Sequence, residues 1–167
     1  MSNAARRIQA ETKMPTIIRD ATAADIPAIF DVRTSVRENH ISVEQMATMG
    51  ITPETIGQAL RDEPCIWVAE QDGQIVGFSM GNAADGCLFA LFVRPEWEGN
   101  GIGRLLMDRA EAFLFLRHQT IWLQTDATTR AAGFYERLGW QRRFVMEGGD
   151  TRFEKPRGAG SAAQGAA

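Results

Sequence analysis

The sequence has little of what several protein classes require. Its two cysteines, Cys65 and Cys87, each lie among apolar residues and are too few for a disulfide framework or a cysteine-based metal site. Its apolar runs, such as residues 112–116, are far too short to cross a membrane, and its polar beginning lacks the apolar core of a signal peptide. We therefore expect a cytoplasmic protein in a reducing compartment, with no membrane partner and no metal.

An excess of basic charge is absent as well. The chain has 18 Lys and Arg residues against 21 Asp and Glu residues, which gives a formal net charge of −3. Such a chain has no general positive field for a phosphate backbone, so nucleic acid is not expected as its principal partner. Its 167 residues, 44% of them hydrophobic, suffice for one buried core and are too few for two domains.

The two ends of the chain differ in composition from its middle. Residues 1–14 lack apolar periodicity, which predicts a flexible N-terminal extension. Residues 157–167 fall largely in the low-complexity run GAGSAAQGAA, which predicts a disordered tail. Residues 15–156 are therefore expected to form the single domain.

The first half of this domain contains alternating strand and helix patterns. Residues 16–21 predict a strand, and residues 22–39 predict a helix that begins with a capping pattern. Two short helices are expected to start after Ser42 and after Thr52, because both side chains suit a helix N-cap. Residues 65–93 then hold three β-rich runs separated by Asp-Gly turns, which predicts an antiparallel meander.

The second half of the domain predicts a crossover between parallel strands. A glycine-rich loop and a helix follow the meander, and residues 121–126 predict the next strand. A second helix ends at Gly139, and a hairpin about residues 148–149 closes the domain. The expected fold is α+β around a mixed sheet. The apolar stripe of the first of these helices is expected to comprise Leu105, Leu106, Ala110, Phe113, Leu114 and Leu116.

The stretch VRPEWEGNGIGRLLMDRA places Gly99, Gly101 and Gly103 where a strand gives way to a helix. A side-chain-free loop at a helix start suits an anion, because the first turn presents unpaired N–H groups and a partial positive charge. A Walker loop is excluded, since Arg104 and a leucine stand where it needs Lys with Ser or Thr. A dinucleotide fingerprint is a weaker alternative: Asp126 ends the next strand, but the third glycine comes too early and no tight turn precedes the first.

Two motifs in this order resemble the GNAT superfamily of N-acetyltransferases, over about residues 16–155. LFVRPEWEGNGIGRLLM resembles its acetyl-coenzyme A motif, and FYERLGW resembles its segment with a functional tyrosine. The resemblance implies a mixed, mostly antiparallel sheet flanked by helices, with a divergent parallel strand pair at the coenzyme site. It also implies direct transfer of an acetyl group from acetyl-coenzyme A to an amine in a ternary complex.

The same resemblance implies roles for particular residues. Tyr135 is expected to protonate the leaving thiolate, although a buried structural tyrosine is the alternative. The strand CLFALF lacks the glutamate that many members carry, so the base is left open among Glu38, His40 and Asp126. Glu98 stands where the motif has Arg or Gln; it is expected to face solvent, with Arg104 compensating its charge. The residues expected at the coenzyme are Leu91, Phe92, Val93, Gly99, Asn100, Gly101, Ile102, Gly103, Arg104 and Thr128.

The acceptor is expected to meet the end of the first helix. Arg33 and Arg37 continue its apolar face, where a core-facing helix would ordinarily carry Leu or Val. They are expected either to bind a substrate carboxylate, together with Asn39 and Asp126 at the acceptor side, or to pair with an acidic residue of the chain. The acceptor is a small-molecule amine or an exposed protein amine. A non-catalytic acyl-coenzyme A sensor is the alternative function, and a homodimer is left open.

Overall fold

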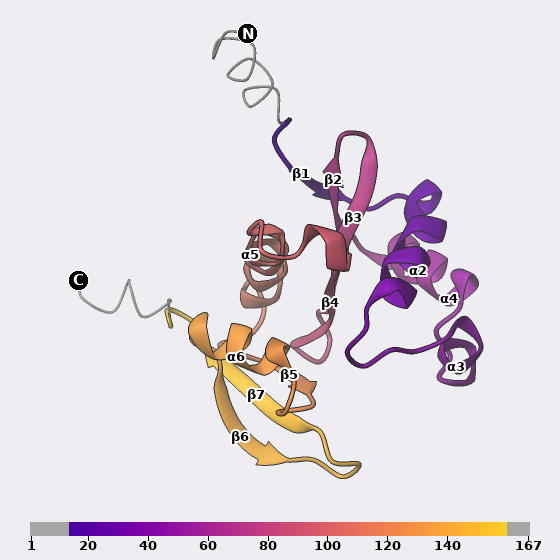
Figure 1. Ribbon diagram of the computed structural model, residues 1–167. Coiled ribbons are helices and arrows are strands. Elements are labelled where there is room, and N and C mark those ends of the chain that lie inside the picture. The colour runs from indigo at the N-terminus through magenta and orange to yellow at the C-terminus, as the bar shows by residue number, and fades with distance from the viewer. Residues whose placement is uncertain (1–13, 160–167) are drawn as a thin grey trace, which may run out of the picture.

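A computed structural model describes residues 14–159 of the protein (Figure 1). Its seven-stranded sheet has the order β1-β2-β3-β4-β5-β7-β6. The strands are β1 (Ile17–Asp20), β2 (Ile66–Gln71), β3 (Gln74–Asn82), β4 (Cys87–Val93), β5 (Thr120–Thr125), β6 (Gln141–Val145) and β7 (Thr151–Pro156). The helices are η1 (Ala23–Asp25), α2 (Ile26–Ser35), α3 (Val43–Thr48), α4 (Pro53–Asp62), η2 (Pro95–Trp97), α5 (Ile102–Phe115) and α6 (Arg130–Arg137). Nearly all of the expected N-terminal extension and most of the expected tail lie outside the described residues, so both stay predictions.

The strand pairing confirms the predicted fold class. Strands β2, β3 and β4 form the expected antiparallel meander, and β7 pairs antiparallel with both β5 and β6. The two halves of the sheet meet through β4 and β5, which are parallel and share the single register position Cys87↔Trp122. A sheet with one parallel pair is not the doubly wound parallel sheet of dinucleotide-binding folds, so that alternative is wrong.

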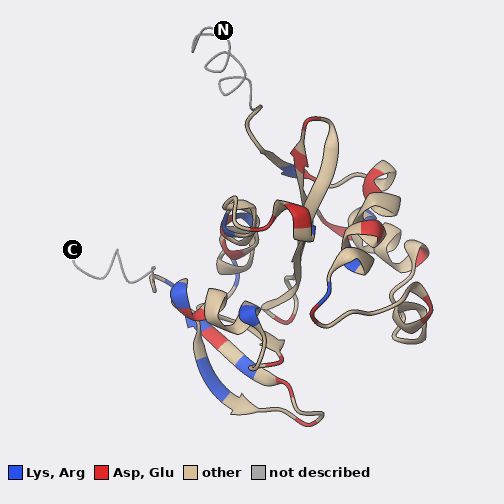
Figure 2. Cartoon of the chain, in the orientation of Figure 1, with Lys and Arg blue, Asp and Glu red and all other residues tan. Residues whose placement is uncertain are grey.

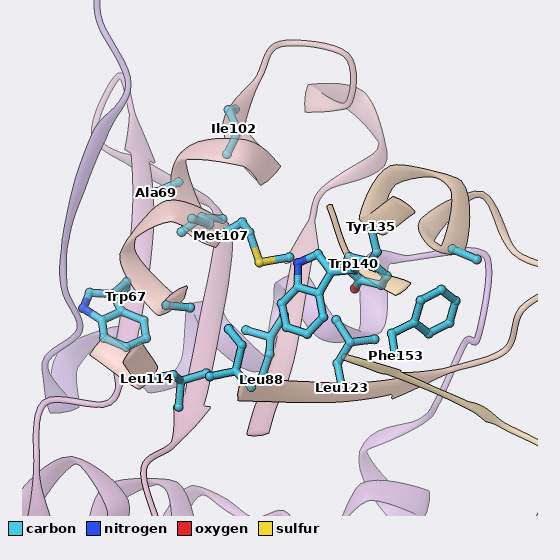
Figure 3. Packing of buried hydrophobic residues seen from close by; sticks show 14 of the residues in the cluster. Trp67, Ala69, Leu88, Ile102, Met107, Leu114, Leu123, Tyr135, Trp140 and Phe153 are labelled. Carbon is cyan, nitrogen blue, oxygen red and sulfur yellow. The ribbon is translucent and has the colours of Figure 1, made fainter. Parts of the chain in front are cut away.

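Helices cover both faces of the sheet. Figure 1 shows α5 on one face and α2 with α4 on the other. On the α5 side, buried residues of the helix meet the sheet in the larger core, which Figure 3 shows around Met107, Trp140 and Phe153. On the α2 side, Ile29 and Val32 pack on the sheet in the second core. The apolar content that predicted one core therefore forms two layers, one on each face.

The predicted helix starts agree with the structure, but the first helix is shorter than expected. Ser42 accepts a hydrogen bond from Gln45 N at 3.1 Å, and Thr52 is the N-cap of α4. The helix predicted to reach residue 39 ends at Ser35, whose hydroxyl donates to Val32 O at 2.6 Å. Val36 then adopts an extended backbone with ψ 146°. Hydroxyl groups that bond back to helix carbonyls, followed by a β-branched residue, favour such an early end.

Helix α5 buries a narrower stripe than the sequence predicts. Its buried residues are Ile102, Leu106, Met107, Ala110 and Leu114. Two leucines predicted to belong to the apolar stripe are exposed: the relative solvent accessibility is 42% for Leu105 and 79% for Leu116. A stretch with apolar residues all round does not by itself reveal which of them face the sheet. Among the described residues, no helix is long and apolar enough to cross a membrane.

Candidate active site

The sheet opens where β4 and β5 diverge. Beyond the single Cys87↔Trp122 position, β4 has a partner on one side only, the antiparallel strand β3. Arg94 N–H donates to Val76 O of β3 at 2.8 Å. Backbone N–H groups alternate in direction along an antiparallel strand, so those of Leu91 and Val93 point away from β3 and into the opening. The strand end predicted to hold the coenzyme thus has donors free to pair with an extended ligand.

The glycine loop leads from this opening into α5. Gly101 is the N-cap of α5 and has φ 78°, a left-handed conformation that side chains other than those of Asn and Asp rarely adopt. The first backbone bond of the helix is Leu105 N–H to Gly101 O at 3.3 Å. The N–H groups of Ile102, Gly103 and Arg104 therefore have no partner within the helix. In charge and in number of donors they fit a pyrophosphate, and the anion site inferred from the glycine spacing stays a prediction.

Gly103 faces α6 and lacks the left-handed backbone of Gly101. A Cβ at this position would lie 3.4 Å from the Phe134 ring of α6. The two helices therefore approach closely beside the loop. By contrast, a Cβ on Gly101 would have no atom within 4 Å, so the space in front of this residue is open.

Glu98 meets an arginine, but not the one expected. Its carboxylate is solvent-exposed and accepts a hydrogen bond from Arg130 Nη2 at 3.3 Å, whereas Arg104 was expected to compensate it. Arg130 is the first residue of α6, and its backbone N–H donates to Glu38 Oε2 at 3.2 Å. A bridge from Glu38 through Arg130 to Glu98 thus connects the loop after α2, the start of α6 and the glycine loop.

One cleft of about 1320 Å³ unites most of the predicted site. It is lined by the glycine loop, the ends of β4 and β5, the start of α6, and the segment from α2 through residue 39. Of the residues predicted from sequence, three do not line it: His40, Asn100 and Thr128. The Asn100 side chain donates a hydrogen bond to Trp97 O at 2.9 Å, which stabilises the conformation of the glycine loop. In Figure 2, basic residues lie at the end of α2, in the loop after it and at the start of α6. Arg33, Arg37 and Arg130 in these segments line the cleft.

Tyr135 lies in the wall of the cleft. Its ring is 7% exposed and packs among Phe134, Trp140 and Phe153, with centroid distances of 5.6, 6.3 and 6.3 Å (Figure 3). Burial raises the pKa of Tyr135 to about 12. Its hydroxyl makes no hydrogen bond with another described residue, although most buried hydroxyls have a partner. The hydroxyl is therefore protonated at neutral pH and has no bond within the described residues that a ligand would have to replace.

The three residues considered as bases differ in their surroundings. The Glu38 carboxylate accepts a hydrogen bond from the backbone N–H of Arg130 at the N-terminus of α6. The His40 ring is exposed, does not line the cleft and makes a hydrogen bond of 3.2 Å with Val36 O. Asp126 lines the cleft, but its carboxylate accepts two hydrogen bonds from Thr128, which hold the pKa of Asp126 below its usual value. None of the three combines access to the cleft with a free carboxylate or imidazole.

Arg33 has the most unusual environment of the cleft. Its guanidinium lies 4.2 Å from the centroid of the Phe92 ring, and its Nη2 donates to Asn39 O at 3.1 Å. Its Nη1 is buried and is the one buried side-chain nitrogen or oxygen of residues 14–159 without a hydrogen-bond partner. Burial lowers the pKa of Arg33. No carboxylate of the described residues forms an ion pair with Arg33, so the expected alternative of an acidic partner within the chain is not realised there.

Sequence reasoning missed two contributors to the cleft. Arg130 has no motif of its own, and only its position at the first turn of α6 brings it to Glu98. Trp122 belongs to no motif, yet it is half-buried and lines the cleft, and the Arg152 guanidinium lies 4.4 Å from the centroid of its ring. The alternation of β5 contains a signal for Trp122, because Ile121 and Leu123 beside it face the opposite, buried side. Among residues 14–159, no three His, Cys, Asp or Glu side chains are grouped so as to hold a metal ion.

Comparisons with known proteins agree with this geometry. Residues 62–142 match the family described as "Acetyltransferase (GNAT) domain". An uncharacterized N-acetyltransferase of Methanocaldococcus jannaschii is 31% identical over 87 residues, which cover 49% of this chain and 56% of that protein. The chain thus aligns with little more than half the length of this relative.

Solved structures share the fold over most of both chains. The PaiA N-acetyltransferase of Thermoplasma acidophilum, solved in complex with coenzyme A, has a TM-score of 0.69 and 19% identity, with 86% of this chain and 99% of that chain covered. A ribosomal-protein-alanine N-acetyltransferase of Brucella melitensis has a TM-score of 0.67 and 21% identity, covering 84% and 99%. The matching domain, residues 62–142, contains the split β4–β5 pair and the glycine loop before α5, and the solved N-acetyltransferases share the fold of most of this chain.

Proposed function

We propose that the protein transfers an acetyl group from acetyl-coenzyme A to the amine of a small molecule or an exposed amine of a protein. The observation that carries this proposal is that one cleft joins the glycine loop, the open edge of β4 and the unbonded Tyr135 hydroxyl. The coenzyme A in the Thermoplasma PaiA structure supports the same kind of occupant for the loop.

The loop and the strand edge suit the two parts of the coenzyme. The N–H groups of Ile102, Gly103 and Arg104 would hold its pyrophosphate, and those of Leu91 and Val93 would pair with its pantetheine arm. When bound, acetyl-coenzyme A supplies a thioester, so a C–N bond to the amine forms as the C–S bond breaks, and one proton passes from nitrogen to sulfur.

Tyr135 is proposed to assist the leaving sulfur by hydrogen bonding. With a pKa of about 12, the phenol keeps its proton at neutral pH. A complete transfer to a thiolate with a reference pKa of about 8.5 would be uphill by about 5 kcal/mol. The phenol therefore releases its proton only as the amine's proton replaces it, directly or through water. Because Tyr135 would gain the amine's proton as it gives its own proton to sulfur, the transfer would need no strong base on β4.

The acceptor side is proposed to be formed by Arg33, Arg37 and Asn39 with Asp126 across the cleft, all of which line it. An acceptor with a carboxylate is favoured, because neither arginine forms an ion pair within the described residues. Glu38 and His40 have weaker support as bases than water, given their contacts.

Thiol release from acetyl-coenzyme A in the presence of an amine panel tests this function. Turnover with at least one amine, absent without enzyme, is expected. Binding of acetyl-coenzyme A without turnover on any amine would favour the sensor alternative instead. A thermal-shift comparison of acetyl-coenzyme A with NAD adds a control for the ligand class, since a ligand at about 100 times its Kd adds about 2.7 kcal/mol of stability.

Location and assembly also belong to this proposal. From composition we propose a cytoplasmic protein without nucleic-acid or membrane partners, and its oligomeric state, including a homodimer, is open to measurement by light scattering.

A further inference from the structure

The unpaired Nη1 of Arg33 needs a physical explanation. Burial of a charged group without a partner is unfavourable, and buried nitrogen atoms of folded proteins nearly always have a hydrogen-bond acceptor. Arg33 receives only partial compensation, from the Phe92 ring and the carbonyl of Asn39. Its position at the last turn of α2 favours a cation but supplies no acceptor to Nη1.

The position of Arg33 relative to β4 suggests the missing partner. Its guanidinium stacks on Phe92, and the residues on either side of Phe92 are those whose N–H groups face the opening. An anion that reaches Nη1 would therefore lie beside the strand edge on which the thioester is proposed to lie. If the anionic group of an acceptor binds at Arg33 Nη1 and its amine lies in the opening, only a few covalent bonds separate the anionic group from the amine.

The cleft also contains acidic side chains. Asp85, Asp126 and Asp150, from the loops β3–β4, β5–α6 and β6–β7, line it together with Arg33. A molecule with both a carboxylate and an amine would find groups of opposite charge to each in this cleft. Glu38, the acidic residue nearest in sequence to the two arginines, is engaged by Arg130 and does not satisfy Arg33.

The cleft beside Arg33 is mostly apolar. The helical turn before Arg33 contributes Ile29 and Phe30, and the ring of Phe78 contacts Phe92 at 5.8 Å. Methionines at 46, 49 and 80 line the same cleft, and their unbranched side chains adapt to ligands of different shape. The region would therefore hold an apolar side chain more readily than a polar one.

Resting on the proposed function, we infer that the acceptor is a small amino carboxylate with an apolar side chain, whose carboxylate is bound by Arg33. The planar guanidinium offers Nη1 to a carboxylate oxygen while Nη2 stays on Asn39. Arg37, which is exposed at the rim, is not part of this contact. A protein amine is disfavoured, because a peptide bond replaces the carboxylate next to the terminal amine.

The test separates acceptor recognition from turnover. Calorimetry measures binding of N-acetyl derivatives of leucine, methionine, phenylalanine, glycine and glutamate, each beside its neutral amide, with and without coenzyme A. We expect the apolar acids to bind at least tenfold more tightly than their amides, a difference of about 1.4 kcal/mol. The preference should disappear in Arg33→Met and persist in Arg61→Met, the control, because Arg61 is exposed on α4 and does not line the cleft. Arg33→Lys keeps the positive charge but not the planar guanidinium, so it should retain part of the preference for acids. This variant replaces Arg33→Met in the test if Arg33→Met does not fold.

The stability of the variants distinguishes binding from a structural role. Because Arg33 has no ion-pair partner, Arg33→Met should leave the Tm of the free protein unchanged or raised. Equal binding of acids and amides, no binding by any acid of the panel, or an acid preference that survives in Arg33→Met would overturn the inference, as would a loss of preference accompanied by a lowered Tm. A failure of the proposed function would be distinguishable, because the enzyme would then release no thiol with any amine and coenzyme A would not change the binding of the acids.

Discussion

Removal of the Tyr135 hydroxyl should separate catalysis from stability. Tyr135→Phe keeps the ring among Phe134, Trp140 and Phe153 and deletes one oxygen. If that oxygen donates to the leaving sulfur, kcat should fall by about 10²–10⁴-fold, the usual contribution of a positioned acid. The KM for acetyl-coenzyme A should change little, because the loop and the strand edge are untouched.

The stability of the same variant should not fall. The Tyr135 hydroxyl has no hydrogen bond to a described residue, so its removal leaves no buried group without a partner. Ser79→Ala is a matched control, because the Ser79 hydroxyl is buried and donates to Leu106 O at 3.0 Å. Its loss should lower the free energy of unfolding by about 1–3 kcal/mol and leave kcat nearly unchanged.

A titration adds an independent readout, since Tyr135 is the single tyrosine of the chain. Ultraviolet absorbance should show tyrosinate forming near pH 12 in the folded protein, against a reference pKa of 10.0. Above pH 10 the unfolded chain loses this proton first, so the free energy of unfolding of the wild type should fall relative to that of Tyr135→Phe, by about 2.7 kcal/mol once the pH exceeds the folded-state pKa. Below pH 10 the hydroxyl is protonated in both states and contributes no slope. Near-normal kcat in Tyr135→Phe would refute the catalytic role, and titration near pH 10 would refute the burial.

Three further predictions concern other parts of the site and core. Gly101→Asn should weaken acetyl-coenzyme A binding at least tenfold by calorimetry, because Asn tolerates φ 78° but places a side chain in the open space before the loop. Gly73→Asn, at a glycine with the same φ and no neighbour within 4 Å, should leave the affinity unchanged. Equal losses of affinity in both variants would contradict the loop assignment. Glu38→Gln should preserve more activity than Glu38→Ala if Glu38 supports α6 rather than acting as a base, and equal inactivation would contradict that role. Lys155→Met should lower the unfolding free energy by about 3–5 kcal/mol in denaturant titrations, because it leaves the Lys155 partner Glu111 buried without its cation; a smaller loss would mean that water reaches this carboxylate.

The sequence predicted those features that depend on local patterns. Helix starts followed from capping residues such as Ser42, the meander from its Asp-Gly turns, and the loop that leads into α5 from glycines at alternate positions. It did not predict where α2 ends, because the competition between helix bonds and the Ser35 hydroxyl is decided within a single turn.

Long-range partners were beyond such patterns. Arg104, six positions away, was expected to compensate the charge of Glu98, but the partner of Glu98 is Arg130 from another helix. The orphaned Nη1 of Arg33 depends equally on tertiary contacts, because only the folded chain shows which carboxylates are already engaged. The two arginines of the first helix looked equivalent by spacing, whereas the early end of α2 leaves Arg33 half-buried and Arg37 exposed.

The single pairing position between β4 and β5 has a consequence for cooperativity. The sheet consists of a four-stranded unit, β1 to β4, and a three-stranded unit, β5, β7 and β6, with little backbone bonding between them. Helix α5 packs against strands of both units. Without ligand, the smaller unit should open on its own, with amide hydrogen exchange faster than in the larger one. A ligand that bonds along β4 and reaches α6 would couple the two units, so that their amides exchange only in a common unfolding event.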